Sequence, residues 1–168
     1  MRTRLRLNQT LNKKPKLENE HVKIIAENRK ARRDYFIVAE YEAGLVLKGT
    51  EVKSLRLGGA NLKDSYARIK NGEVFVYQLH IAPYPFAYYD NHDPLRTRKL
   101  LLNKHEIKRL YGKVNEKGLS LVPLRLYFKS GKAKVLLALA KGKRKYDKRE
   151  AIRRRDDQRD LDRERKAY

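Results

Sequence analysis

The sequence contains no cysteine, so it can form neither a disulfide framework nor a thiolate metal site. It also contains no apolar run near the roughly 20 residues that a membrane-spanning helix needs. The first ten residues, MRTRLRLNQT, lack the apolar centre of a secretory signal. These absences fit a reducing compartment, and they predict a soluble cytoplasmic protein that makes no membrane contact.

Motifs for catalysis are missing as well. There is no G-x-S-x-G, no Walker loop and no paired-carboxylate motif. His92 with Asp90 and Asp93 could be a ligand trio, but a solvated loop is the simpler interpretation. A nuclease built on Glu42, Asp64 and a metal ion has no supporting spacing. We therefore predict a binding protein that is not an enzyme and needs no metal or other cofactor.

Positive charge is what the sequence has in excess. Its 42 Lys and Arg face 20 Asp and Glu, for a formal net charge of +22. The excess is +7 over residues 1–34, +9 over residues 35–140 and +6 over residues 141–168. A basic body with basic arms at both ends is the electrostatic pattern of a nucleic-acid-binding protein. A membrane surface fits less well, because neither arm forms an amphipathic helix with a bulky apolar face.

Composition divides the chain into three parts. Residues 1–20 mix cations and Asn with isolated leucines, which predicts a flexible extension. Residues 21–140 are enough to close one hydrophobic core and are predicted to form an RNA-binding barrel domain. Residues 141–168 retain only Ile152 and Leu161 as large aliphatics, too few to offset the entropy of ordering. We predict a basic tail that is disordered until it meets a polyanion; the alternative is a tail that only adds solubility.

The first half of the barrel domain is predicted from its periodicity. Residues 35–48 alternate with period two, which indicates a long strand, bent or bulged near Gly44. Residues 50–57 fit a short helix with Thr50 as its cap and Gly58–Gly59 after its end. The dipeptide Asn71–Gly72 is typical of a type I′ hairpin. It sets four predicted cross-strand pairs: Lys70 with Glu73, Ile69 with Val74, Ala67 with Val76, and Tyr66 with Tyr77.

The second half begins with a loop rich in proline and aromatic residues over 83–100. Asn103 and Glu106 form a capping-box pair that predicts a helix with an apolar stripe of Ile107, Leu110, Tyr111 and Val114. A hairpin should follow over residues 119–141, with a bulge or an edge at Pro123. Its predicted inward residues are Val122, Leu124, Leu126, Phe128, Val135, Leu137 and Leu139; its predicted outward residues are Arg125, Tyr127 and Lys129. We therefore predict an α+β fold, mainly β: a small antiparallel barrel of the oligonucleotide-binding type with flanking helices and a basic tail.

Candidate binding residues lie on the predicted loop and on the first strand. Arg96, Arg98 and Lys99 could hold phosphates, or could be solvated loop charges. The aromatic residues of the loop could stack on unpaired bases or cover one end of the core; they are Tyr84, Phe86, Tyr88 and Tyr89. Glu42 is an acidic residue on a basic surface. It could accept hydrogen bonds from base N–H groups, or form a salt bridge.

Four segments, in this order and spacing, resemble the SmpB family of SsrA-binding proteins. They are YFIVAEYEAGLVLKGTEVKSLR, GGANLKDSYARI, HDPLRTRKLLLN and AKGKRKYDKRE. The resemblance covers about residues 26–150. It implies an oligonucleotide-binding-like barrel with flanking helices and a disordered tail. It also implies binding to the tRNA-like domain of transfer-messenger RNA, and its delivery with elongation factor Tu and GTP to ribosomes stalled without a stop codon.

The resemblance also implies site residues. The family's RNA-contact positions match Asn28, Glu42 and Leu101. Its decoding-site positions match the tail residues Lys143, Tyr146, Asp147, Lys148 and Arg149, and relatives carry Tyr or His where Tyr146 stands. The resemblance also implies that the body stands in for the missing anticodon arm, while the tail occupies the decoding centre and the empty message channel of the small ribosomal subunit. The protein is expected to act as a monomer. The first 20 residues and the segment RDLDRERKAY, which lacks a late aliphatic pair, depart from the family pattern.

Two other classes share this composition. A constitutive ribosomal protein is equally basic, tailed and free of cysteine. A general chaperone of single-stranded RNA would bind RNAs indifferently at low salt. The composition alone separates neither from a ribosome-rescue factor.

Overall fold

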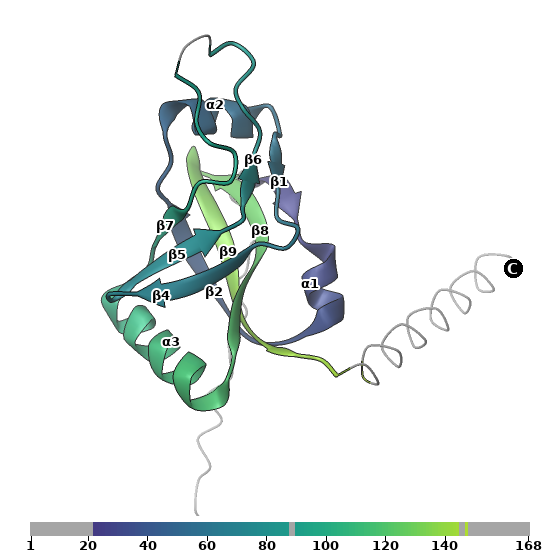
Figure 1. Cartoon of the computed structure of the whole chain (residues 1–168), viewed down its shortest axis with the longest axis vertical. Helices are drawn as coiled ribbons and strands as arrows, with labels where there is room; N and C mark the ends of the chain where they lie inside the picture. The colour runs from purple at the N-terminus through teal and green to yellow at the C-terminus, as the bar shows by residue number, and fades with distance from the viewer. Residues whose placement is uncertain (1–21, 88–89, 145–146, 148–168) are drawn as a thin grey trace, which may run out of the picture.

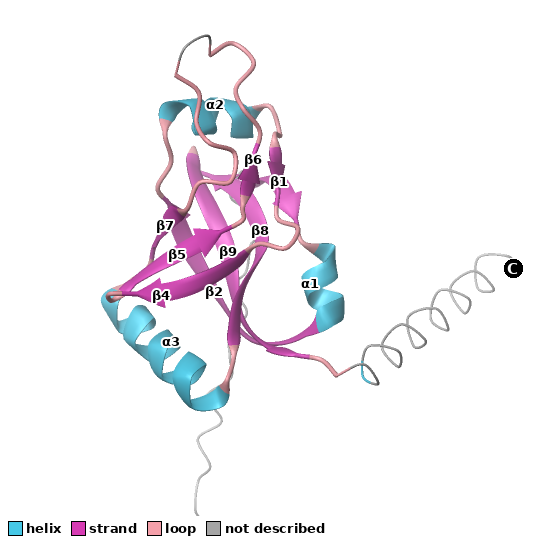
Figure 2. Cartoon of the chain, viewed as in Figure 1, coloured by secondary structure: helices cyan, strands magenta, loops and turns pink. Residues whose placement is uncertain are grey.

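The computed structural model describes residues 22–87, 90–144 and 147. The predicted extension 1–20 and most of the predicted tail, including Tyr146, Lys148 and Arg149, lie outside these residues. The described residues form an antiparallel barrel flanked by helices (Figure 1, Figure 2). The strands are β1 (Val22–Glu27), β2 (Tyr35–Leu45), β3 (Ala60–Asn61), β4 (Tyr66–Lys70), β5 (Glu73–Tyr77), β6 (His80–Ile81), β7 (Arg98–Leu101), β8 (Ser120–Lys129) and β9 (Lys132–Gly142). The helices are α1 (Arg29–Asp34), α2 (Gly49–Arg56) and α3 (Lys104–Lys117).

The main sheet closes on itself. Its strand order is β1-β8-β4-β5-β7-β2-β9, and β9 pairs back with β8. β4 and β8 meet at one pair, Ala67 and Leu121, whereas β2 and β9 pair along most of their length. The prediction of a small, partly open antiparallel barrel is therefore confirmed, and the seam between β4 and β8 is its loosest join.

The Asn71–Gly72 hairpin forms as predicted. Both central residues have positive φ, 52° and 74°, as a type I′ turn requires. All four predicted pairs of β4 and β5 are present. The ring centroids of Tyr66 and Tyr77 lie 5.4 Å apart in a stacked arrangement. A two-residue turn leaves no freedom to shift the strands, so the local sequence determines the register.

The predicted helices are also present, with one correction at a cap. α3 begins with the expected capping box, in which the backbone N–H of Asn103 donates to Glu106 at 3.0 Å, and it ends before Gly118 at φ 58°. α2 begins after Lys48 instead of at Thr50, because the Lys48 N–H donates to Glu51 at 2.7 Å. The apolar stripe of α3 packs on the barrel except for Tyr111, which is 56% exposed.

The apolar side chains form two clusters instead of one, because β8 contains a bulge. The pairing with β9 shifts between Pro123 and Arg125, which reverses the facing of the residues that follow. Leu126 and Phe128 face the barrel core as predicted, but Val122 and Leu124 do not. These two join a second cluster outside the barrel with Ala31, Tyr127, Leu136 and Ala138. Tyr127, predicted to point outward into solvent, is 1% exposed.

Three further features of the secondary structure differ from the predictions. The bulge of β2 lies between Ile37 and Ala39 instead of near Gly44. α1 and β7 were not predicted as elements. α1 coincides with the basic cluster at residues 29–33, and β7 begins inside residues 83–100, which were predicted to form a proline-rich loop. β9 extends through Gly142 and so includes the first two residues of the predicted tail, and the backbone N–H of Lys143 donates to the Asp34 carbonyl oxygen at 2.9 Å.

Candidate RNA interface

Two of the predicted contact residues come together on the outer surface of the barrel. Leu101 on β7 lies opposite Gly44 on β2. A Cβ on Gly44 would be 3.2 Å from the Leu101 Cβ, so glycine allows the leucine to lie directly over this strand. Glu42 precedes Gly44 by two residues and therefore faces the same side. Leu101 is 52% exposed, which leaves an apolar side chain open to a partner beside a carboxylate.

Glu42 is surrounded by donors. The Tyr127 hydroxyl donates to its Oε2 at 2.8 Å, and the Nζ atoms of Lys129 and Lys134 lie 3.7 and 3.3 Å from its carboxylate. Partial burial acts to raise the pKa of Glu42, but these hydrogen bonds and charges outweigh it, so the pKa lies below its ordinary value. Burial raises the pKa of the Tyr127 hydroxyl above its ordinary value, and the hydrogen bond to the Glu42 carboxylate raises it further. The carboxylate thus holds two surface lysines and is anchored from below by the hydroxyl of the buried Tyr127.

The three predicted cations, Arg96, Arg98 and Lys99, separate on β7 and on the residues before it. Lys99 faces outward with Leu101 and forms an ion pair with Glu73, both side chains being partly exposed. Arg98 faces inward and is fully buried. Its guanidinium donates to Glu51 at 2.8 Å and to the backbone oxygens of Leu79, Arg96 and Pro94. In this conformation Arg98 cannot reach a phosphate, which corrects the prediction of three loop cations on the surface.

Arg96 shares the same buried carboxylate. Its Nη2 lies 2.6 Å from Glu51, and its side chain keeps 28% of its surface exposed. Burial acts to raise the pKa of Glu51, but the hydrogen bonds from Arg96 and the backbone of Lys48, with the charge of Arg98, hold it below its ordinary value. One buried carboxylate therefore ties α2 to the start of β7.

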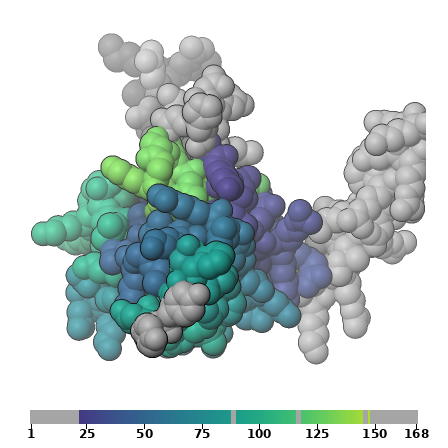
Figure 3. Space-filling view, turned by 90° about the horizontal axis from the view of Figure 1, so that it is seen from above, coloured from purple at the N-terminus to yellow at the C-terminus, as the bar shows by residue number. Residues whose placement is uncertain are grey.

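The loop before β7 lies against the same end of the barrel. His92 is buried, with Nδ1 3.0 Å from the Thr50 hydroxyl and Nε2 3.2 Å from the Ile81 carbonyl oxygen. Ser54 donates to the Ala82 carbonyl at 2.6 Å. Figure 3 looks onto this end and shows the loop beside α2. His92 is thus buried and hydrogen-bonded at both ring nitrogens, which corrects the prediction of a solvated loop at this position. Among the described residues no group of three or more His, Asp or Glu could hold a metal ion.

The aromatic residues of this loop lie at the surface where the structure describes them. Tyr84 and Phe86 are in edge contact, with ring centroids 5.5 Å apart, and Phe86 is 69% exposed. The Lys53 ammonium lies 5.5 Å from the centre of the Tyr84 ring. Tyr88 and Tyr89 lie outside the described residues. Phe86 is thus not a cover for the barrel core.

Asn28 lies at the start of α1 and joins this helix to the barrel. Its side-chain oxygen accepts from the Ala31 N–H at 3.0 Å and so caps α1. Its amide donates to the carbonyls of Leu62 at 3.2 Å and Pro123 at 3.4 Å. Asn28 therefore fixes α1 to the barrel.

The first tail residues begin close to α1. The Lys143 ammonium lies 4.8 Å from the centre of the Phe36 ring and 3.5 Å from the Arg32 carbonyl oxygen. The Arg144 N–H donates to Asp147 at 3.1 Å. Lys143 and Asp147 are thus the two predicted decoding-site residues that the structure describes. Lys143 is attached to the body.

Sequence reasoning missed Tyr127, Lys129 and Lys134 as neighbours of Glu42. Alternation indicated an outward facing for Lys129. The pairing of Lys134 with Tyr127 lies between the turn and the bulge, so the bulge does not alter it. The available signal was the hairpin turn at Ser130–Gly131, both at positive φ, which anchors the pairing of Lys129 with Lys132. Counting from that turn places Lys134 beside Tyr127.

A small, partly open antiparallel barrel with flanking helices is an oligonucleotide-binding-like barrel. None of the helices within residues 22–87 and 90–144 is long and apolar enough to span a bilayer.

Comparison with known proteins identifies the family. The model of the SmpB protein family matches residues 25–167. The SsrA-binding protein of Syntrophobacter fumaroxidans is 62% identical over 147 residues, covering 88% of this chain and 91% of the relative. That of Caldicellulosiruptor bescii is 58% identical over 153 residues, covering 91% and 97%. A solved chain described as "tmRNA-SmpB: a journey to the center of the bacterial ribosome" is 57% identical with a TM-score of 0.62, covering 76% of this chain and 94% of its own. The chain belongs to the SmpB family.

Proposed function

We propose that the protein binds the tRNA-like domain of transfer-messenger RNA and delivers it to ribosomes stalled on messages without a stop codon. Elongation factor Tu with GTP takes part indirectly, through the RNA. Membership of the SmpB family supports this function, and so does the solved relative described as tmRNA-SmpB on the bacterial ribosome. The observation that carries it is the outer surface on which Glu42 and Leu101 lie together among lysines.

The geometry of this surface suggests how it binds RNA. Lys129 and Lys134 are held by Glu42 and can approach phosphates from fixed positions. Leu101 offers an apolar contact for a base or sugar, and Lys99 extends the cationic surface along β7. Glu42 acts by fixing its neighbours and can also accept from a base N–H group, which cations cannot do. Arg96 stays in this proposal as a peripheral contact, and Arg98 supports the strand from inside.

The tail has a separate task. We place Lys143, Tyr146, Asp147, Lys148 and Arg149 at the decoding centre and message channel of the small ribosomal subunit. The cations meet ribosomal phosphates there, and Tyr146 can stack on unpaired bases. Lys143 is held against Phe36 and α1, so the path of the tail starts at a defined point on the body.

The protein acts by binding, without catalysis, as a cytoplasmic monomer. No cofactor takes part in this function. The RNA is the reacting species in the rescue reaction, because it carries the aminoacyl group.

The direct test is to sequence the RNA that co-purifies with the tagged protein, after fractionating the lysate on a sucrose gradient. A rescue factor is substoichiometric on ribosomes and carries one small RNA with a tRNA-like end. A constitutive ribosomal protein would stay stoichiometric on salt-washed subunits. A general RNA chaperone would return a mixture of unrelated RNAs. Either of these two results contradicts the proposal.

A further inference from the structure

Tyr127 is a buried tyrosine that lies outside the barrel core. Its ring is 1% exposed and belongs to the second cluster. Ile24 on β1 and Lys134 on β9 are its cross-strand partners, so a strand lies on each side of it. Its hydroxyl donates to Glu42 Oε2 at 2.8 Å. A buried ring thus carries its one polar group to a carboxylate on the proposed RNA surface.

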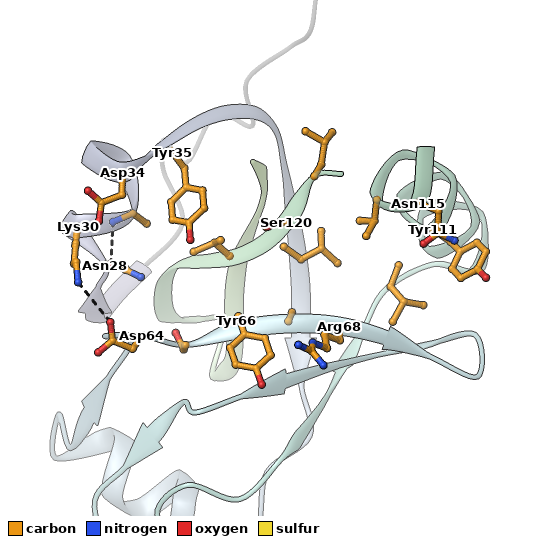
Figure 4. Close-up of a pocket in the computed structure, with 18 residues that line it drawn as sticks. Asn28, Lys30, Asp34, Tyr35, Asp64, Tyr66, Arg68, Tyr111, Asn115 and Ser120 are labelled. Carbon is orange, nitrogen blue, oxygen red and sulfur yellow. Dashed lines mark hydrogen bonds and ion pairs between the residues drawn. The ribbon is translucent and has the colours of Figure 1, made fainter. Parts of the chain in front are cut away.

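Packing fixes the position of this ring. Ala31 on α1 and Leu124 on β8 are buried in the same cluster. Figure 4 shows α1 with Asn28 at its start, and the Asn28 amide joins this helix to two backbone carbonyls of the barrel side. An aromatic side chain has only two rotatable bonds, and close packing holds both. The position of the Tyr127 hydroxyl is therefore set by the cluster beneath the surface.

The other two partners of Glu42 are of a different kind. The Nζ atom of Lys134 lies 3.3 Å from Oε1, and that of Lys129 lies 3.7 Å from Oε2. Both lysine side chains are partly exposed and have flexible stems, so they can move together with the carboxylate. Without a fixed donor, the carboxylate could turn toward either ammonium group. Tyr127 supplies that fixed donor and so determines how the carboxylate is oriented.

The fixed carboxylate retains acceptor capacity for a partner. An ionised carboxylate has about four acceptor sites and no donor, which is more than Tyr127 and the two lysines use. The lowered pKa of Glu42 keeps this group ionised at neutral pH, and the raised pKa of Tyr127 keeps the phenol protonated as a donor. Such a carboxylate accepts from a base N–H and repels phosphate oxygens. It can therefore distinguish RNAs, whereas lysines meet the phosphates of any sequence.

We propose that Tyr127 is a specificity-determining residue of the RNA surface. Its hydroxyl holds the Glu42 carboxylate in the orientation that accepts from a base of the tRNA-like RNA. Tyr127 is buried and does not touch the RNA, so it is a positioning residue. This role rests on the proposed function, and it separates affinity, which the lysines supply, from specificity, which Tyr127 and Glu42 supply together.

The test compares the binding of two RNAs to the full chain at fixed salt. One is the tRNA-like domain of transfer-messenger RNA, and the other is an unrelated hairpin RNA of equal length. Tyr127→Phe removes the hydroxyl and keeps the ring in its cluster. We expect affinity for the tRNA-like RNA to fall about 10-fold, near the lower end for a lost hydrogen bond to a charged group. Affinity for the unrelated RNA should stay unchanged, so the ratio of the two affinities falls by the same factor.

Two further variants show whether Tyr127 acts through Glu42. In a Glu42→Ala background, Tyr127→Phe should not lower the ratio further, because the hydroxyl no longer has a carboxylate to hold. Tyr41→Phe is the matched control. It removes a hydroxyl from the neighbour of Glu42 on β2, whose side chain packs against the barrel core on the opposite face. The wild-type ratio should be retained in Tyr41→Phe.

The possible results separate a positioning role from a packing role. A ratio that falls in Tyr127→Phe, holds in Tyr41→Phe and falls no further in the double variant supports the proposal. An unchanged ratio in Tyr127→Phe, additive losses in the double variant, or a parallel loss of both affinities would overturn it. Failure of the proposed function gives a different result, because the wild-type protein would then bind both RNAs with equal affinity.

Discussion

At the scale of single residues, the most informative feature is a carboxylate on a strongly basic protein. Removal of an acidic residue ordinarily strengthens RNA binding, because each lost negative charge reduces repulsion of phosphates. Glu42 should behave in the opposite way. It holds Tyr127, Lys129 and Lys134 in place, so its loss releases side chains on the proposed RNA surface.

Glu42→Ala should therefore weaken binding to the tRNA-like RNA by about 1–3 kcal/mol, the range of one good base-specific contact. Glu40→Ala is the matched control, because Glu40 lies on the same strand but pairs with Arg32 at 3.5 Å. Titrations at fixed salt measure both variants. Tighter binding by both, in equal measure, would mean that only net charge matters at this surface.

Arg98 is the opposite case, a cation that serves the fold. It is fully buried with Glu51, and its other donors meet backbone carbonyls. Arg98→Ala leaves the carboxylate without its closest buried partner, and should lower the free energy of unfolding by about 3–5 kcal/mol. Arg96→Ala, at a partly exposed position, should cost about 1 kcal/mol or less. Urea denaturation compares the two; equal small losses would contradict the structural role of Arg98.

The same network predicts an acid limit to stability. Because the pKa of Glu51 is lower in the folded protein than its ordinary value of 4.5, its contribution is complete above pH 4.5. It is lost as the pH falls below that value toward the folded-state pKa. Glu51→Gln should lower stability at neutral pH but flatten this dependence, whereas Glu73→Gln, at a partly exposed carboxylate, should leave it close to wild type. Urea midpoints between about pH 6 and about pH 3 test the comparison; parallel curves for Glu51→Gln and wild type would refute it.

At the scale of elements, β7 explains why three neighbouring cations have different roles. Its pairing with β5 and β2 turns Lys99 and Leu101 outward and Arg98 inward. A loop would have left all three side chains free, which is what the prolines and charges around residues 94–99 suggested. The strand forms because it fills the gap between β5 and β2, a long-range requirement that no local pattern contains.

Lys99→Ala and Arg96→Ala should each lower RNA affinity and reduce the slope of log affinity against log salt concentration by about one. Lys99 has the clearer expectation, since it faces outward beside Leu101. Arg109→Ala on α3 serves as a control for loss of charge elsewhere. An unchanged slope in both Lys99→Ala and Arg96→Ala would place this strand outside the interface.

The elements also show which features a sequence can predict. The β4–β5 hairpin follows from Asn71–Gly72 alone, and the α3 cap follows from Asn103 and Glu106 three residues later. Both are local, since the turn or cap determines its own neighbourhood. The two-cluster core was not predicted, because one extra residue beside Pro123 reverses the facing of the rest of β8. Counted back from the hairpin turn, period-two reasoning is correct for Leu126 and Phe128, and on the other side of the bulge it is inverted for Val122 and Leu124.

The candidate site also contains some residues that the sequence predicts and others that only the fold brings together. Glu42 was placed on an outward face by alternation, and its choice over other acids came from the family resemblance. Its lysine partners come from strands about 90 residues further along the chain, so only the fold brings them together. Asn28 was predicted as an RNA contact, and its hydrogen bonds show that it also caps α1. A local signal for this cap was present, because Asn28 immediately precedes α1. It was overlooked because the cations of α1 were interpreted only as a basic cluster.

At the scale of the whole molecule, we propose a division of work between the folded body and the basic tail. The body should bind the tRNA-like RNA through the surface around Glu42 and Leu101. The tail should act on the ribosome. The body ends later than composition indicated, because Lys141 and Gly142 pair with Phe36 and Tyr35, and Lys143 is bonded to Asp34. A truncation that separates the two parts should therefore retain residues 1–144.

The most direct test of this division is a pair of assays on the protein truncated after residue 144. We expect unchanged affinity for the tRNA-like RNA, with loss of peptidyl transfer to alanyl transfer-messenger RNA on ribosomes with an empty message channel. The reason is that residues 145–168 contain only Ile152 and Leu161 as large aliphatics, so their removal costs the barrel little packing. Normal transfer by the truncated protein, or RNA binding lost in parallel with transfer, would contradict the account.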